Sequence, residues 1–303
     1  MTTTNPRRSL TRTLALVALS GALVVTGAEL GGCKHKLGSR LGQRLGKGGV
    51  RARLVANNRA TMIAIDGEPV VSGRFTAMDV ENQNGSITII CSDRYTEASI
   101  QARMPKNDRE EVESWGLDST DKDNWVIAEH DSGPDRSILR VTTLNAPLEN
   151  GFQPRIDLII KTPVCDGLLV RNAGGSVDVT GVRGAITIES GYAGGEGGRV
   201  EVRTAEPIIE PVRITSSVGP VYLVVPPESK GTIDIESDGG MAVFNTSFGR
   251  VVNVEPTQNR WTGVWNDGEN MIQLYAGHAD ARMLVVERPI TYSTGAQYSS
   301  VFD

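Results

Sequence analysis

Reactive and aromatic side chains are scarce in this sequence. Its 303 residues include three Cys, three His and 15 aromatic residues, and its formal charge is −5. An acidic chain lacks the basic surface that non-specific nucleic-acid binding needs. His35, His130 and His278 are far apart, and no nucleophile elbow, paired-His zinc helix or phosphate loop occurs. We therefore expect no catalytic residues, no cofactor, no metal and no nucleic-acid partner.

Only one long apolar run is present, the 15 residues from Leu14 to Ala28. It is shorter than the roughly 20 residues that a membrane-spanning helix needs. Arg7, Arg8 and Arg12 precede it and small residues follow it. This order of charged, apolar and small residues is typical of a secretory signal, so the sequence predicts export.

The run ends in Leu30-Gly31-Gly32-Cys33, which resembles the lipobox of bacterial lipoproteins. The resemblance implies a signal peptide over residues 1–32, cleavage before Cys33 and lipidation of the new N-terminal cysteine. Two or three acyl chains hold a protein firmly on a membrane, whereas one does so only marginally. Glu29 departs from the pattern. The alternative is ordinary secretion, with Cys33 incidental.

Residues 33–54 contain seven Lys and Arg and no acidic residue, on a repeated Leu-Gly pattern. The dense glycine disfavours a helix, so we expect a flexible tether. Residues 54–303 then hold 21 basic and 35 acidic residues, a net charge of −14. A basic tether is attracted to an anionic membrane surface; the alternative is a solvated spacer. Lys34 stands where inner-membrane lipoproteins carry Asp, which by resemblance favours the outer membrane.

The body alternates apolar and polar residues behind regularly placed glycines. The repeated unit is Gly, any residue, apolar, polar, apolar, as in Gly175–Val179, Gly184–Ile188, Gly198–Val202, Gly231–Ile235 and Gly240–Phe244. Period-two alternation predicts strands with one buried face, and spacings of about nine residues indicate repeats that stack. We predict an all-β, single-domain β-solenoid of the parallel β-helix kind over 55–260. Val177, Ile186, Ile233 and Val243 should face its core; a β-sandwich is the alternative.

The segments Val80–Ile89, Ile156–Pro163 and Val221–Pro226, with the glycine-led units between them, resemble the DUF4097 family of adhesin-like proteins. The resemblance spans about residues 75–250. It implies a β-solenoid and a surface-associated role, and it supplies no catalytic residue.

Two segments depart from the repeat. The charged stretch near 105–137 predicts a long solvated loop. Residues 261–303 hold six of the 15 aromatic residues, namely Trp261, Trp265, Tyr275, Tyr292, Tyr298 and Phe302. We expect this segment to cap the open end of the stack; a carbohydrate-stacking platform is the sharper alternative.

Several outward positions could line a groove, as the carboxylates of a glycosidase do. They are Asp178, Glu189, Glu201, Asp234, Glu236, Arg203 and Arg213. Polar outward residues are equally what solubility requires. Cys91 and Cys165 follow apolar strands, and the sequence leaves open whether they form a disulfide or two buried thiols.

Together these features predict a lipid-anchored protein of the bacterial cell envelope. A non-catalytic β-solenoid surface for adhesion or scaffolding is the leading hypothesis, with envelope polysaccharide or protein as its partner. An enzyme acting on polysaccharide, a lyase or hydrolase on the same scaffold, is the alternative.

Overall fold

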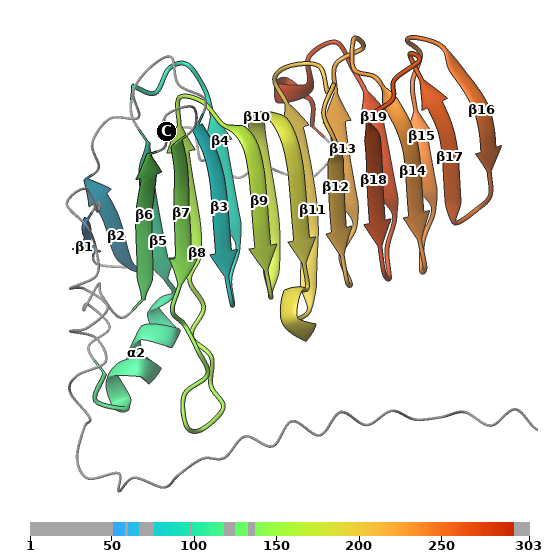
Figure 1. The fold of residues 1–303 in the computed structure, drawn as a ribbon. Helices are drawn as coiled ribbons and strands as arrows, with labels where there is room; N and C mark the ends of the chain where they lie inside the picture. Colours follow the sequence, from blue (N-terminus) through green and yellow to red (C-terminus); the bar gives the residue numbers. More distant parts are fainter. Residues whose placement is uncertain are drawn as a thin grey trace, which may run out of the picture.

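The computed structural model describes residues 51–57, 60–66, 76–96, 98–117, 125–132 and 137–293. These residues form nineteen strands, one α-helix and two short 3-10 helices, so the expected all-β class is confirmed (Figure 1). The signal peptide and the tether up to residue 50 lie outside the described residues. Arg51 and Arg53, expected in the flexible tether, belong instead to strand β1 (Arg51–Asn57).

The strands pair into two ladders. Ladder A contains, in spatial order, β1, β2 (Ala60–Asp66), β5 (Ser99–Met104), β8 (Asp157–Thr162), β4 (Ile87–Cys91), β10 (Gly175–Ser190), β11 (Gly197–Thr204), β13 (Val221–Val225), β19 (Ala281–Val285) and β15 (Ala242–Asn245). Pairing is parallel from β8 to β15 and antiparallel from β1 to β8.

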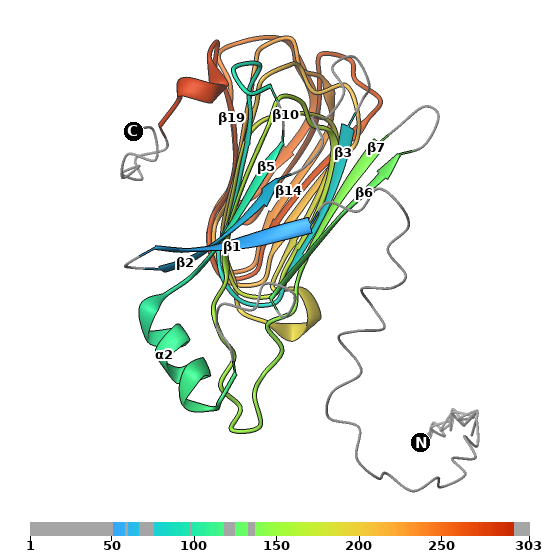
Figure 2. The same cartoon turned by 90° about the vertical axis from the view of Figure 1, so that its left-hand side faces the viewer.

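Ladder B contains β6 (Val126–Ser132), β7 (Ser137–Thr143), β3 (Thr76–Asn82), β9 (Asp166–Asn172), the second half of β10, β12 (Val212–Ser216), β18 (Met271–Ala276), β14 (Gly231–Ser237), β17 (Arg260–Trp265) and β16 (Val251–Pro256). Pairing is parallel from β7 to β14. Figure 2, which looks along the stack, shows the two ladders as facing layers.

Strand β10 shows how the chain passes between the ladders. Val177 pairs in ladder A and Ile186 pairs in ladder B, within one continuous strand. The nine-residue spacing from Gly175 to Gly184 therefore marks half a circuit and not a whole repeat. We call a ladder B strand with the ladder A strand that follows it a rung.

The rungs do not stack strictly in sequence order. β3–β4 lies between β7–β8 and β9–β10, and β18–β19 lies between β12–β13 and β14–β15. The expectation of successive stacking therefore holds only for the middle of the chain. It also means that residues 271–285 form an interior rung, so the predicted C-terminal cap over 261–303 is wrong there.

The core consists of aliphatic columns between the ladders. Ile89, Val179, Val202, Leu223 and Met283 share one register across ladder A, and all are buried. Burying each such side chain contributes about 1.5 to 3 kcal/mol relative to exposure. The predicted inward positions Val177, Ile186 and Ile233 are confirmed.

Val243 was predicted to face the core, and this is wrong. Ala242 is buried, Phe244 packs against the core, and Val243 between them is only half-buried on the other side of β15. The strand follows the alternation counted from Gly240, because side chains at i and i+2 share a face. Phe244 packs against Trp261 and Trp265 of β17, with ring centroids at 4.7 and 5.6 Å.

The charged stretch near 105–137 is not a loop throughout. It contains helix α2 (Lys106–Ser114) and strand β6. Val112 of α2 is fully buried, and Lys106 pairs with Glu110 one turn along at 3.2 Å. Lys, Arg and Glu have good helix propensity, which the prediction of a solvated loop overlooked.

A buried polar residue and a glycine recur where ladder B strands turn into ladder A. Asn82, Asn172, Ser216 and Ser237 are buried, and each stands three residues before a glycine. The Gly219 N–H donates to Ser216 Oγ at 3.0 Å and the Gly240 N–H donates to Ser237 Oγ at 2.8 Å. These bonds satisfy backbone groups that the turn removes from the ladders.

The glycines at this corner pack on one another from rung to rung. A Cβ on Gly198 would lie 2.5 Å from the Gly175 oxygen, and one on Gly219 would lie 2.2 Å from the Gly198 carbonyl carbon. No positive φ is needed at Gly219. A glycine is therefore required at position 219 because the backbone of the neighbouring rung lies so close to it.

We predict that Gly219→Ala lowers the free energy of unfolding by at least about 2 kcal/mol, because the added methyl group must push two rungs apart. Chemical denaturation monitored by circular dichroism measures this. Gly174→Ala is the control, since its Cβ would only touch Asn84 Oδ1 at 3.4 Å. Equal stability of the two variants would contradict the proposed packing.

Candidate functional site

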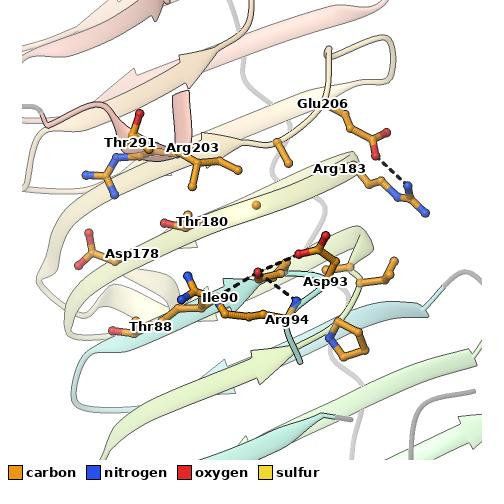
Figure 3. Close-up of a pocket in the computed structure, with 18 of the residues that line it drawn as sticks. Thr88, Ile90, Asp93, Arg94, Asp178, Thr180, Arg183, Arg203, Glu206 and Thr291 are labelled. Atoms are coloured by element: carbon orange, nitrogen blue, oxygen red, sulfur yellow. Dashed lines mark hydrogen bonds and ion pairs between the residues drawn. The ribbon is translucent and has the colours of Figure 1, made fainter. Parts of the chain in front are cut away.

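A large hollow in the described part of the chain lies on the outer face of ladder A. It is a cavity of about 1000 Å³ whose floor is formed by β4, β10 and β11 (Figure 3). Its walls are the turn at Ser92–Arg94, the segment Pro163–Cys165 and the C-terminal residues 290–293. These last residues begin in the 3-10 helix η3 (Pro289–Thr291), which returns from β19 and contacts β11.

The floor follows from the strand register. Thr88, Asp178 and Glu201 occupy one outward row across β4, β10 and β11. Ile90, Thr180 and Arg203 occupy the next row. Side chains two residues apart share a face of the strand. The floor is lined by Thr88 and Ile90 of β4, Asp178 and Thr180 of β10, and Arg199 and Arg203 of β11, and Glu201 between the two arginines is fully buried.

An ion cluster at the floor includes Arg199, Glu201 and Arg203, all from β11. The Glu201 carboxylate forms ion pairs with both guanidinium groups. Glu201 is fully buried and the Arg203 side chain is 4% exposed, although both are on the outward face of a strand. Arg199 also lies over the Tyr222 ring at 5.3 Å from its centroid.

The rest of the cavity lining contains both positively and negatively charged side chains. Arg183 pairs with Glu206 at 2.9 Å at one end of the cavity. At the turn, Arg94 Nε donates to Ser92 Oγ at 3.3 Å, with Asp93 alongside. Apolar surface comes from Ile290 and Tyr292, which are 47% and 39% exposed.

We predict that Glu201→Gln lowers the free energy of unfolding by about 3 kcal/mol, because it leaves two partly buried cations without their shared anion. Urea denaturation at neutral pH measures this. Glu206→Gln is the control; it breaks a more exposed pair and should cost less than about 1 kcal/mol. A loss no larger for Glu201→Gln than for Glu206→Gln would refute the assignment.

Cys91 and Cys165 meet in the wall of this cavity. Both are buried and free in the structure, and both line the hollow. A hydrogen bond with the Cys91 thiol, burial and the negative charge of Asp166 raise the pKa of Cys165. Whether the two join is still a prediction, since the structure holds them as thiols in contact.

We predict that a disulfide oxidant such as oxidised glutathione joins this pair. The two thiols lose two protons and two electrons, one S–S bond forms, and two molecules of reduced glutathione leave. A disulfide that closes the loop between Cys91 and Cys165 stabilises the fold by about 4.5 kcal/mol in the chain-entropy model. Mass analysis after alkylation of the unfolded chain measures the outcome. Two alkylatable thiols at Cys91 and Cys165 after oxidation would contradict the prediction.

The seven groove candidates divide between two faces. Asp178, Glu201 and Arg203 lie on ladder A, whereas Glu189, Arg213, Asp234 and Glu236 lie on ladder B. The ladder B members Arg213, Asp234 and Glu236 line a smaller hollow, of about 420 Å³, with Tyr275, whose hydroxyl donates to Asp238 Oδ2 at 2.5 Å. That hydrogen bond, with burial and the negative charge of Asp238, raises the pKa of Tyr275. The single convergent groove considered from the sequence does not form.

The lipobox residues Leu30, Gly31, Gly32 and Cys33 lie outside the described residues. Tyr298 and Phe302 do too. Within the described part, no helix is long and apolar enough to cross a membrane. No group of three His, Cys, Asp or Glu side chains in the same part could hold a metal ion.

The cavity was not predicted from the sequence, because its walls come from distant segments of the chain. One signal was present in the sequence: Arg199, Glu201 and Arg203 alternate along one strand and so share its outward face. Nothing local shows that residues 290–293 return to β11.

Two solved structures align with most of the chain at low identity. A proposed cell adhesion protein from Clostridium sporogenes covers 75% of this chain and 100% of its own length, at 12% identity and a TM-score of 0.41. A proposed adhesin from Bacteroides fragilis covers 76% of this chain and 98% of its own, at 11% identity and a TM-score of 0.27. These TM-scores are too low to carry a conclusion about function.

No protein-family model and no curated protein matches the chain. Membership of the DUF4097 family therefore stays a prediction.

Proposed function

We propose that this chain is a lipid-anchored protein of the bacterial cell envelope, whose body is a β-solenoid used as a non-catalytic surface for adhesion or scaffolding. The N-terminal order of arginines, apolar run and Leu-Gly-Gly-Cys supports export and an anchor on Cys33. The basic residues that follow would hold the tether against an anionic membrane surface. Lys34 favours the outer membrane.

The strand pairing supports the solenoid architecture. In the middle of the stack, neighbouring strands within each ladder pair in parallel. The chain alternates between ladder A and ladder B from β9 through β13. Buried aliphatic residues from both ladders form one core cluster. In a β-solenoid, ladders of parallel strands face each other across a shared core in this way.

The observation that carries the binding role is the stack of parallel rungs itself. Successive rungs hold their outward side chains in fixed register, so ladder A and ladder B each offer a long, rigid polar face. A rigid surface binds with little loss of conformational entropy. Envelope polysaccharide or protein is the partner class that fits an exported, membrane-held surface.

The alternative of a polysaccharide-acting enzyme has less support. A glycosidase needs two carboxyl groups about 5 to 10 Å apart on either side of one bond. The candidate carboxylates divide between the ladders. On ladder A the Glu201 carboxylate is fully buried between two arginines. On ladder B, where Asp234 and Glu236 line one hollow, Arg260 donates two hydrogen bonds to the Asp234 carboxylate, at 3.0 and 3.1 Å. We therefore retain the binding role.

We predict that the chain, expressed in a bacterium that makes lipoproteins, incorporates labelled palmitate and fractionates with membranes. Cys33→Ala should lose the label and the membrane association, because no thiol remains at the lipidation position. Autoradiography and cell fractionation measure this. Cys91→Ala is the control and should keep the label. Palmitate retained by Cys33→Ala would refute the anchor.

A further inference from the structure

We infer that the cavity on ladder A binds an uncharged, hydroxyl-rich ligand, a short saccharide segment. This inference rests on the proposed envelope-binding function and names the ligand class for it. Four properties of the cavity support the assignment. They are the balance of charges in its lining, the absence of an unpaired strand edge on its floor, the mixture of polar and apolar side chains that line it, and its volume.

Charges around the cavity cancel. The lining contains the cations Arg94, Arg183, Arg199 and Arg203 and the anions Asp93, Asp178 and Glu206. Glu201 adds a fourth carboxylate, bound between Arg199 and Arg203. An anion entering the cavity would meet guanidinium groups that already have carboxylate neighbours, and it would approach a body of net charge −14. An uncharged ligand pays neither cost.

The floor offers no free backbone edge. β4 pairs with β8 and β10, β10 pairs also with β11, and β11 pairs also with β13. A peptide that binds by adding a strand needs unpaired backbone N–H and C=O groups. The backbone groups of the floor strands are already paired with neighbouring strands, so recognition on the floor comes from side chains.

The side chains suit hydroxyl groups with apolar faces between them. The Thr88 and Thr180 hydroxyls both donate and accept, the Asp178 carboxylate accepts, and guanidinium groups donate. Tyr292 adds an aromatic ring to the lining, and Ile290, Pro163 and Val164 add apolar surface. A sugar ring presents the same combination, with hydroxyls at its edge and C–H groups on its faces.

The cavity has room for more than one sugar ring. Its volume of about 1000 Å³ is at the upper end of ordinary ligand sites. It is also partly open to solvent, so a longer chain could extend out of it.

Isothermal titration calorimetry of the full-length protein in detergent tests the inference. The probes are four tetrasaccharides: cellotetraose, chitotetraose, mannotetraose and, as the acidic comparison, tetragalacturonate. We expect saturable heat with at least one neutral probe and at least tenfold weaker binding of the acidic one.

Two variants and one control locate the site. Asp178→Asn removes an acceptor charge and Tyr292→Ala removes the ring; each should weaken binding of the neutral probe about tenfold, the effect of losing one charged hydrogen bond or one stacking contact. Glu189→Gln changes the outward carboxylate of the same strand β10 on ladder B and should leave binding within twofold. Circular dichroism verifies that all three variants are folded.

Three results would overturn the inference: no heat with any neutral probe, stronger binding of tetragalacturonate, or unchanged binding in both cavity variants. The measurement uses purified protein and does not depend on lipid. A failure here therefore leaves the anchor and the scaffold role standing, whereas the palmitate experiment can fail without affecting saccharide binding.

Discussion

The close approach of backbone to backbone at one corner of the rungs is the constraint on which the rest of this structure depends. Parallel strands are held about 4.8 Å apart by their hydrogen bonds, and the turns between ladders must keep that same spacing. At Gly175, Gly198 and Gly219 there is no room for a Cβ between one turn and the next. A larger residue would separate the turns, and the aliphatic columns behind them would lose their register. Buried Asn and Ser at the same corner then satisfy the backbone groups that the ladders cannot reach.

Local alternation predicted strands β10, β11, β14 and β15 and, except at Val243, their buried faces, because the period of two is a property of each strand alone. It could not predict which strands are neighbours. Val80, Val170 and Ile188 occupy equivalent positions in adjacent ladder B strands, and an aliphatic rung fits equally well between many others. The insertion of β3–β4 and β18–β19 out of sequence order therefore has no local signature. The error at Val243 has a simpler cause. The small residue Ala242 occupies the core position, whereas the larger and more hydrophobic Val243 next to it was expected there.

The candidate site likewise has one part that a single strand predicts and another that depends on distant segments of the chain. The cluster of Arg199, Glu201 and Arg203 can be read from one strand, since the three residues alternate along it. The cavity cannot, because it exists only where the returning C-terminal segment faces the turn after β4. The outward Glu201 is fully buried, and its carboxylate pairs with the arginines two residues before and after it in the same strand. A residue that alternation places on the surface can therefore be buried by its own neighbours in the strand.

The structure also changes how the acidity of the body should be interpreted. Residues 54–303 carry a net charge of −14. Many of their carboxylates nevertheless pair with nearby arginines: Asp79 and Glu81 with Arg171, Asp234 with Arg260, and Asp280 with Arg282. Such pairs shorten the reach of each charge, and salt screens what remains within about 10 Å. Long-range attraction of a cationic partner is then a weak source of specificity. The shape and donor pattern of a cavity act at contact and are less affected by salt, which is why the hollow on ladder A, and not the net charge, is the better guide to what this surface binds.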